Sequence, residues 1–387
     1  MSPPKNTPIL LVATATKWLG TARMPRSLAK AGFEVSLLAP KGTLAEHSRF
    51  VTRVGHLPDN ASPRQWIYAF AAMVKATSPR LVVPCDDLAF RLMQMLVQAP
   101  PQNLQATLRL QLAALVTDSL GDPAFYNTSV DKLRLPAAAA AVGVRMPAST
   151  VVATVAEAEA FAALHGYPVV LKRSYSSAGD GVEIAPDRAG LDHAFGALSR
   201  AGAIDLWGSA SKGLLAQAHI AGRTKNYTVL AWKGTLLTGY ASEKLIANPV
   251  AKGPSTVARY HCSPEIRDMA VKLARGFGIT GLAALECLVD ERSGIPYLIE
   301  INRRLVPGGH RGSQFGVDHA AALHAAVHGL PSPTRADLDP GEEHLGVHFP
   351  QEWLRDPESQ WLRVHPVDVP WDDPALMEAM FALRHEP

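Results

Sequence analysis

The stretch GLAALECLVDERSGIPYLIEINRR, residues 281 to 304, carries two acids and an amide whose spacing could bind a metal ion. Two apolar runs flank a polar turn, a pattern that predicts a β-hairpin. If Glu286 faces Glu300 in that hairpin, Asn302 lies on the same face, because side chains alternate along a strand. Opposed carboxylates repel each other unless a cation lies between them. Two carboxylates and an amide oxygen suit Mg²⁺, which would keep water and phosphate oxygens as its other ligands.

The register of this hairpin depends on its turn. We expect the turn to span residues 291 to 295, with Asp290 paired with Pro296 across it. Counting back from that pair places Glu286 directly opposite Glu300. The alternative interpretation is an exposed hairpin face whose acids point to water.

A lysine and a glycine-containing loop form a second group that could do chemistry. PVVLKRS, residues 168 to 174, predicts a strand that carries Lys172 and runs into the loop SSAGDGV, residues 176 to 182. Loop N–H groups can surround phosphate oxygens, glycines let the backbone approach, and the ammonium adds a point charge. Two observations weigh against a phosphate site: such loops are also common as plain turns, and Asp180 would repel a phosphate if it turned inward.

The elements that must position these groups begin with an alternation of strands and helices. Apolar runs starting near residues 8, 34 and 81 predict strands, and helical patterns cover residues 19 to 31 and 62 to 77. This rhythm predicts a parallel sheet covered by helices, as in a Rossmann-like domain. Its ligands would bind at the carboxyl ends of the strands, where Thr14 to Lys17 and Asp86 lie. Asp86 or Asp87 could equally cap the helix that follows.

The sequence pattern changes in the later part of the chain. Residues 213 to 222 read as a strand, two more strands surround the turn at Lys233 and Gly234, and residues 263 to 278 predict an amphipathic helix. Another helix is expected near residues 317 to 329. The tail from residue 331 shows little regular pattern, and its tryptophans are expected to be buried: Trp353, Trp361 and Trp371.

Composition excludes several classes of protein. The chain has 387 residues, 47% of them hydrophobic, and a formal net charge of +3, which does not favour nucleic acid as a partner. The N-terminal apolar run is too short for a signal peptide or membrane span, so no membrane association is expected. Three widely separated cysteines favour neither disulfides nor zinc and fit a reducing cytoplasm.

Taken in order, these motifs resemble the ATP-grasp superfamily of carboxylate-amine ligases over roughly residues 120 to 330. Five segments carry the resemblance: Asp131-Lys132, expected on a helix, Lys172, the loop 176 to 182, the hinge strand AQAHI at 216 to 220, and Glu286 with EINRR at 300 to 304. The resemblance implies an α/β Rossmann-like (pre-ATP-grasp) domain over residues 1–118 and a two-lobed α+β ATP-grasp domain over 119–330. The small lobe would cover about 150–220, and 331–387 would be a C-terminal extension packed on the body.

The resemblance also implies a binding site for ATP and Mg²⁺, or Mn²⁺ in its place. ATP would lie between the lobes, with the loop 176 to 182 folded over its phosphates. The residues expected to contact the phosphates are Lys132, Lys172, Ser176, Ser177, Gly179 and Gly181. Adenine would contact the backbone of Gln217, Ala218, His219 and Ile220. The metal ion would be bound by Glu286, Glu300 and Asn302. Arg304, with Lys172, would act on the transferred phosphoryl group. Ala218 and Thr224 stand where acids are common in the family, so ribose recognition is unexplained.

The implied activity is an ADP-forming ligase that joins a small-molecule carboxylate to an amine through an acyl phosphate. Four residues could contact the substrate: Arg259, His310, Arg311 and Asp86. For His310, a solvent-exposed loop histidine is an equal alternative. A biotin-carboxylase-like enzyme, a carboxylate kinase and a catalytically silent nucleotide-binding protein remain open, as does a homodimer.

Overall fold

The computed structural model describes residues 6–102, 104–175, 181–200, 213–250 and 253–385. The chain divides into two compact units. The first unit comprises Met1–Pro123, Asn226–Ala284 and Asn302–Pro387, and the second comprises Ala124–Lys225 and Leu285–Ile301. The division falls within three strands: β9 (Gly222–Trp232), β12 (Gly281–Asp290) and β13 (Pro296–Asn302).

The first unit begins with a four-stranded parallel sheet of order β3-β2-β1-β4. Its strands are β1 (Thr7–Val12), β2 (Phe33–Pro40), β3 (Val51–Leu57) and β4 (Leu81–Pro84). Strands β1, β2 and β4 are almost wholly buried, which explains why their apolar runs predict them. Strand β3 was not predicted, because its residues are mostly half-buried or exposed and leave no apolar run.

Four helices follow the strands of this sheet: α1 (Leu19–Ala31), α2 (Pro63–Thr77), α3 (Asp87–Gln98) and α4 (Ala106–Leu120). The predicted ranges of α1 and α2 are confirmed. Ser62 caps α2 through a reciprocal pair of hydrogen bonds with Gln65, a type of cap that stabilises a helix by roughly 1 kcal/mol. Helix α1 ends at Gly32, whose φ of 110° lies in the left-handed region that favours glycine.

A six-stranded sheet of order β13-β12-β9-β10-β11-β14 continues the fold. Besides β9, β12 and β13 it contains β10 (Thr235–Ala247), β11 (Ser255–His261) and β14 (Glu343–Val347). The strands predicted around Lys233 and Gly234 are confirmed as β9 and β10. The two later predicted helices are present as α9 (Pro264–Gly276) and α10 (His319–Val327).

The tail contains more regular structure than its sequence indicates. Besides β14 it forms α11 (Gln351–Arg355), α12 (Trp361–Val364) and α13 (Pro374–Ala382). Phe349, Leu376 and Met380 are buried in a cluster with Ala22 of α1 and Leu44. The predicted burial of Trp371 is wrong, because this residue lies in the connection between α12 and α13 and is 74% exposed.

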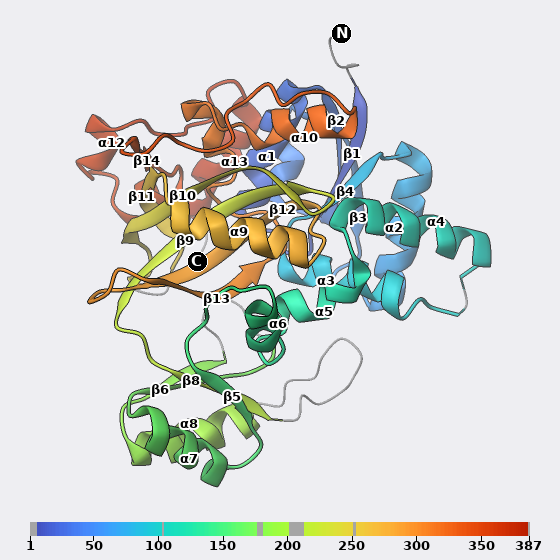
Figure 1. Cartoon of the computed structure of the whole chain (residues 1–387). Helices are drawn as coiled ribbons and strands as arrows, with labels where there is room; N and C mark the ends of the chain where they lie inside the picture. The colour runs from blue at the N-terminus through green and yellow to red at the C-terminus, as the bar shows by residue number, and fades with distance from the viewer. Residues whose placement is uncertain (1–5, 103, 176–180, 201–212, 251–252, 386–387) are drawn as a thin grey trace. The chain divides into compact units, whose positions relative to one another are not determined.

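The second unit contains an antiparallel sheet of order β5-β8-β6-β7 (Figure 1). Its strands are β5 (Ser149–Val152), β6 (Val169–Lys172), β7 (Val182–Ala185) and β8 (Leu214–Ala218). Helices α7 (Val155–His165) and α8 (Arg188–Arg200) cover one face of it (Figure 1). Two short helices, α5 (Tyr126–Val130) and α6 (Leu135–Ala141), lead into the sheet. Among the helices described in both units, none is long and apolar enough to cross a membrane.

Candidate functional site

Strand β6 carries Lys172 on the face of the small sheet that α7 and α8 leave uncovered. Val169 and Leu171 pack into the apolar cluster under the two helices, so Val170 and Lys172 point to the opposite face. On the neighbouring strand, Leu215 lies directly beside Lys172 in the register. The prediction that Lys172 lies on a strand is therefore confirmed. Of the loop 176 to 182, Ser176, Ser177 and Gly179 lie outside the described residues.

Gly181, close to the end of the loop 176 to 182, lies among the described residues. Gly181 has a φ of 73°, and its carbonyl accepts a 3.0 Å hydrogen bond from the N–H of Arg173. The hydrogen bond joins the residue after β6 to the residue before β7. A backbone with positive φ is one that glycine adopts at little cost, which is the local reason for a glycine here.

Gln217 of β8 lies on the same face of the small sheet as Lys172, the face that α7 and α8 do not cover. It is 2% exposed and has Ser149 and Val170 as its cross-strand neighbours. In the part of the chain that the structure describes, Nε2 of Gln217 reaches no hydrogen-bond acceptor. A buried amide without a partner is costly, so this atom is suited to a ligand that brings an acceptor.

Strand β8 ends one residue after Gln217, so most of the predicted hinge lies beyond the strand. Ala218 is the last residue of β8, and its N–H already donates to Ala148 O at 2.8 Å. His219 is exposed and Ile220 is half-buried. An adenine at the hinge would therefore have to use backbone groups other than the N–H of Ala218.

A second lysine lies close to an acid of the hairpin. Nζ of Lys132 is 3.5 Å from Oε2 of Glu300, and the Lys132 side chain is only 9% exposed. Burial, followed by the charge of Lys132, lowers the pKa of Lys172 to about 8, while Glu300 and Glu286 act in the opposite direction. The two lysines and two carboxylates therefore interact electrostatically in the second unit.

The connection between α5 and α6 fixes the position of Lys132. Asp131 is the C-cap residue of α5, so the prediction that this pair is carried on a helix is wrong. Oδ1 of Asp131 accepts a 2.6 Å hydrogen bond from Ser174 Oγ, and the N–H of Lys132 donates to Ser174 O at 3.0 Å. These bonds tie Lys132 to the end of the strand that carries Lys172. Ser174, which the sequence analysis missed, is thus a positioning residue.

The hairpin that carries the acids forms over the predicted residues, β12 and β13, but its turn closes differently. The N–H of Asp290 donates to Ile295 O at 3.0 Å, whereas the prediction pairs Asp290 with Pro296. The Asp290 carboxylate accepts from the N–H groups of Arg292 and Ser293, which folds the turn inward. Direct pairing of Glu286 with Glu300 stays a prediction.

The acids of the hairpin suit a hard cation. Both lie near enough to Lys172 to raise its pKa, and the Glu300 side chain is 30% exposed. No group of three or more His, Cys, Asp or Glu side chains capable of metal binding occurs among the described residues. Carboxylate oxygens fit Mg²⁺ better than a metal that needs a closed protein cage. Asn302, the third predicted ligand, is the last residue of β13.

Arg304 lies in the first unit, between an acid and an aromatic ring. Its Nε donates to Asp87 Oδ1 at 3.0 Å, and its Cζ lies 4.8 Å from the centre of the Trp18 ring. Trp18 is held in turn by a 3.3 Å hydrogen bond from Nε1 to Leu305 O. Asp87 and Trp18 thus position the guanidinium at the carboxyl ends of β4 and β1.

Asp86 has a structural role in the same region. It is the N-cap of α3 and accepts from Ala89 N, which confirms the capping interpretation. Its carboxylate also accepts hydrogen bonds from Thr14 N, Thr14 Oγ1 and Ala15 N. With four hydrogen bonds made inside the protein, this carboxylate joins β1 to β4 and has little capacity left for a substrate.

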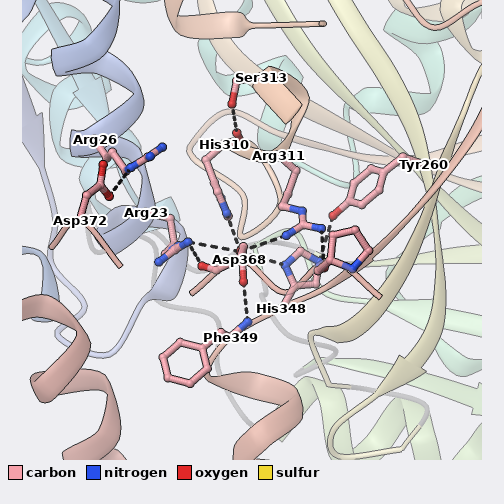
Figure 2. Close-up of polar contacts among 11 residues, drawn as sticks. Arg23, Arg26, Tyr260, His310, Arg311, Ser313, His348, Phe349, Asp368 and Asp372 are labelled. Atoms are coloured by element: carbon pink, nitrogen blue, oxygen red, sulfur yellow. Dashed lines mark hydrogen bonds and ion pairs between the residues drawn. The ribbon is translucent and has the colours of Figure 1, made fainter. Parts of the chain in front are cut away.

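The remaining substrate candidates differ in access. Arg259 is 40% exposed and lies 3.6 Å from Glu343, so a ligand could reach it. His310 and Arg311 are buried at 8% and 1% exposure around Asp368 (Figure 2). The interpretation of His310 as a solvent-exposed loop histidine is wrong, because Nε2 of this ring lies 2.6 Å from Asp368 Oδ2.

A cavity of about 420 Å³ lies in the second unit, between α6 and the edge of the small sheet. Its lining is largely aliphatic and includes Leu133, next to Lys132, and Leu215, beside Lys172. Ser149 and Thr150 contribute the polar side chains. The lining includes neither lysine.

Comparisons with known proteins were made for sequence and for structure. Residues 131–223 match the family model described as carbamoyl-phosphate synthase L chain, ATP binding domain. The arginine-specific large chain of mitochondrial carbamoyl phosphate synthase from Schizosaccharomyces pombe is 26% identical over 281 residues, 69% of this chain. That match covers 23% of the yeast protein, so the chain spans about a quarter of this relative.

Solved structures cover most of the chain. The biotin carboxylase domain of Hydrogenobacter thermophilus 2-oxoglutarate carboxylase, a dimer in complex with MgADP, ADP and bicarbonate, has a TM-score of 0.68 at 17% identity, covering 88% of this chain and 73% of that one. Staphylococcus aureus N5-carboxyaminoimidazole synthetase with ADP has a TM-score of 0.62 at 13% identity, covering 89% and 83%. L-amino acid ligase from Bacillus licheniformis has a TM-score of 0.58 at 15% identity, covering 89% and 80%.

Proposed function

We propose that this chain, which has the ATP-grasp fold, is an ATP-dependent ligase that joins a carboxylate to an amine and releases ADP and phosphate. The matches confirm the ATP-grasp resemblance predicted from the sequence. The observation that carries the proposal is the cluster of Lys132, Lys172, Glu286 and Glu300 beside the uncovered face of the small sheet. We also interpret the parallel sheet β1–β4 as the pre-ATP-grasp domain and the second unit's sheet as the small lobe.

ATP is proposed to bind along the uncovered face that carries Lys172 and Gln217. Lys132 lies 3.5 Å from Glu300, and Lys172 interacts electrostatically with Glu300 and Glu286. An ammonium group can act as a point charge on phosphate oxygens, so both lysines are proposed to contact the phosphates. The unpartnered Nε2 of Gln217 offers a donor to the base. Backbone groups from Gln217 to Ile220 would complete the contact with adenine, and Ser176, Ser177, Gly179 and Gly181 would approach the phosphates.

The residues that would hold Mg²⁺ are Glu286, Glu300 and Asn302. The ion supplies neutralisation of the phosphate charge when bound. Lys132 lies 3.5 Å from Glu300 and partly compensates the charge of that carboxylate. Two of the similar solved structures are complexes with MgADP or ADP, which supports the same ligands for this chain.

The proposed reaction has two steps. A carboxylate oxygen of the substrate attacks the γ-phosphorus of ATP, the bond from that phosphorus to the β–γ bridging oxygen breaks, and ADP leaves. Lys172 and Arg304 stabilise charge on the transferred group, and Asp87 orients the guanidinium. The amine nitrogen then attacks the acyl carbon, phosphate leaves, and the nitrogen loses a proton to solvent.

A protein nucleophile is not proposed for the first step. Cys287, next to Glu286, is fully buried, and burial raises the pKa of its thiol to about 12. A thiol with that pKa carries almost no thiolate at neutral pH. The phosphoryl acceptor is therefore the substrate carboxylate itself.

The proposal is tested by a screen of amino acids and small carboxylates, with and without amines, for ATP-dependent phosphate release. The nucleotide product is identified in each positive well, and hydroxylamine replaces the amine to trap an acyl hydroxamate. ADP with a hydroxamate supports the proposal. AMP with pyrophosphate would mean adenylation and would overturn it.

The same screen separates the alternatives. Release of phosphate with bicarbonate, in place of any organic acid, would indicate biotin-carboxylase-like chemistry. An acyl phosphate that accumulates and resists every amine would indicate a carboxylate kinase. ATP binding without turnover in any well would indicate a catalytically silent nucleotide-binding protein.

A further inference from the structure

Five polar side chains of the first unit form a buried cluster around Asp368, which we call the Asp368 cluster (Figure 2). Its members come from helix α1, the segment 305–311 that follows Arg304, the residue after β14, and the tail: Arg23, His310, Arg311, His348 and Asp368. The exposed fraction is 1% for Arg311, 3% for His348 and Asp368, and 8% for His310. Charged groups this deeply buried are rare unless they are paired.

The Asp368 carboxylate is the hub of the cluster. Oδ1 accepts from Phe349 N at 2.6 Å, and Oδ2 accepts from His310 Nε2 at 2.6 Å. Arg23 and Arg311 each place a guanidinium nitrogen 3.7 Å from the same Oδ2. Burial would raise the pKa of Asp368, but Arg23, His310 and Arg311 hold it well below its usual value. The carboxylate is therefore ionised and joins parts of the chain that are far apart in the sequence.

The charges around Asp368 are balanced. Burial lowers the pKa of both histidine rings of the cluster, to about 4 and about 3, so both are neutral at pH 7. The guanidinium groups of Arg23 and Arg311 are matched by two carboxylates, those of Asp368 and Asp373, and Asp373 interacts favourably with Arg23. Asp373 is itself buried, at 1% exposure. Removing one member of such a buried set leaves another charge uncompensated, which is strongly unfavourable.

The far end of the segment 305–311 is held by this cluster, and its middle folds into two tight turns. The N–H of Gly309 donates to Val306 O at 3.0 Å, and the N–H of Arg311 donates to Gly308 O at 3.0 Å. Arg311 itself is fixed from its other side by a 3.3 Å hydrogen bond from Nη2 to a carbonyl of the tail. The segment is therefore restrained along its length, and a shift at its far end is passed along it.

The near end of the segment supports Arg304. The N–H of Leu305 donates to Pro84 O at 3.2 Å, and Leu305 O accepts from Trp18 Nε1 at 3.3 Å. The centre of the Trp18 ring lies 4.8 Å from Cζ of Arg304. A displacement of the Leu305 carbonyl would therefore move the ring against which the guanidinium lies.

Helix α1 contacts the cluster, the segment and Trp18. Arg23 of this helix belongs to the cluster, and Gly20, earlier on the same helix, packs on the segment. A Cβ at Gly20 would lie 3.1 Å from the carbonyl carbon of Val306, 3.2 Å from Pro307 N and 3.0 Å from Trp18 Nε1. Such close packing leaves the segment little room to shift without moving Trp18.

We propose that Asp368 is a positioning residue for Arg304. By holding the last two residues of the segment 305–311, the carboxylate fixes the segment, and the segment fixes the ring of Trp18 against the guanidinium. The inference rests on the proposed role of Arg304 in phosphoryl transfer, where a misplacement of about 1 Å can lower the rate about a hundredfold. The tail thus contributes to the reaction without contacting the substrate.

Trp18 reports on this coupling without any substrate, so a first test is independent of the proposed function. The full chain is labelled with 5-fluorotryptophan, and the ¹⁹F resonance of Trp18 is assigned with Trp18→Phe. His310→Ala removes the donor that faces Asp368, whereas His310→Gln supplies an amide N–H on a side chain of similar reach. The Trp18 resonance should move in His310→Ala and stay near its parent position in His310→Gln.

A charge-balanced double variant separates positioning from stability. Asp368→Asn removes one negative charge and should lower the thermal unfolding midpoint, and adding Arg311→Met restores the balance and should recover part of the loss. Positioning requires that the Trp18 resonance stay displaced in the double variant. Its return to the parent position would show that the cluster only stabilises the fold. Glu358→Gln, at an exposed acid of the tail that pairs with Arg363, is the control and should leave the resonance in place.

Steady-state kinetics connect the displacement to the reaction. With a carboxylate and an amine that the parent converts, kcat of His310→Ala should fall by about tenfold to about a hundredfold while the KM for ATP changes little, and His310→Gln should retain most of the parent kcat. A parent without turnover would refute the proposed function and leave the Trp18 resonance to decide on Asp368. An unmoved resonance in folded His310→Ala, or full kcat where the resonance has moved, would overturn the positioning role.

Discussion

Nζ of Lys132 lies 3.5 Å from Oε2 of Glu300, although 168 residues separate them in the chain. The pair joins the segment between α5 and α6 to strand β13, within one compact unit. Lys172 interacts electrostatically with both partners. Mutating any one of these residues therefore changes the charge that the other two experience.

Replacing Glu300 with Gln should reduce Mg²⁺-dependent turnover by about a hundredfold or more and leave the fold intact, because the amide has the same shape without the charge. Turnover at a series of Mg²⁺ concentrations and the circular dichroism spectrum measure the two effects. Glu358→Gln, at an exposed acid of the tail, is the matched control. Unchanged activity in Glu300→Gln would remove this residue from the metal site.

Replacing Lys172 with Met should weaken ATP binding by about tenfold to about a hundredfold, because a hydrogen bond to a charged group contributes roughly 1.5–3 kcal/mol. The apolar stem of Met still fills the buried strand position. Calorimetric titration with ATP measures the change, with Lys272→Met, an exposed lysine of α9, as the control. Equal affinity in parent and Lys172→Met would place the nucleotide elsewhere.

Replacing Arg304 with Lys should lower kcat by about a hundredfold with a smaller change in the KM for ATP, since a lysine keeps the charge but loses the planar fork. Asp87→Asn should lower kcat by a smaller factor, because the guanidinium loses its charged partner but remains against Trp18. Steady-state kinetics of both variants test this order. A larger effect of Asp87→Asn than of Arg304→Lys would contradict it.

The free energy of unfolding should fall as the pH is lowered from about 6.5 toward 4. Burial lowers the pKa of His310 from 6.5 to about 4, so the unfolded state binds the proton first and acid favours unfolding. The stabilisation is complete above pH 6.5, and its loss through this one ring is about 3 kcal/mol. Urea denaturation at pH 7 and pH 4 measures the difference, which should be smaller in His310→Asn. An identical pH dependence in that variant would show that other groups cause the loss.

Local chemistry explains what the sequence predicted well. A periodic pattern, a cap or a turn within a few residues indicates each of five elements: α1, α2, β6, β9 and β10. Asp86 caps α3 as its position before the helix indicates. Lys172 could be placed on a strand because the run of apolar residues around it is continuous.

Long-range contacts explain what could not be predicted. Asp368 meets His310 across 58 residues, and nothing near either residue signals the pair. Strand β3 has no apolar run because most of its residues are half-buried or exposed. Strand β14 of the tail pairs with β11, which is far from it in the sequence. The turn over residues 291–295 was predicted, but its hydrogen bonds were not: the N–H of Asp290 donates to Ile295 O, and the Asp290 carboxylate accepts from N–H groups of the turn.

Transfer of oxygen from the substrate tests the central claim most directly. A carboxylate found in the screen is labelled with ¹⁸O and incubated with ATP, Mg²⁺ and the amine, and the phosphate released is examined by ³¹P NMR. An acyl phosphate intermediate requires that one ¹⁸O atom pass from the carboxylate into the phosphate, with ADP as the nucleotide product. Unlabelled phosphate formed together with the amide would show that the carboxylate is not phosphorylated and would contradict the account.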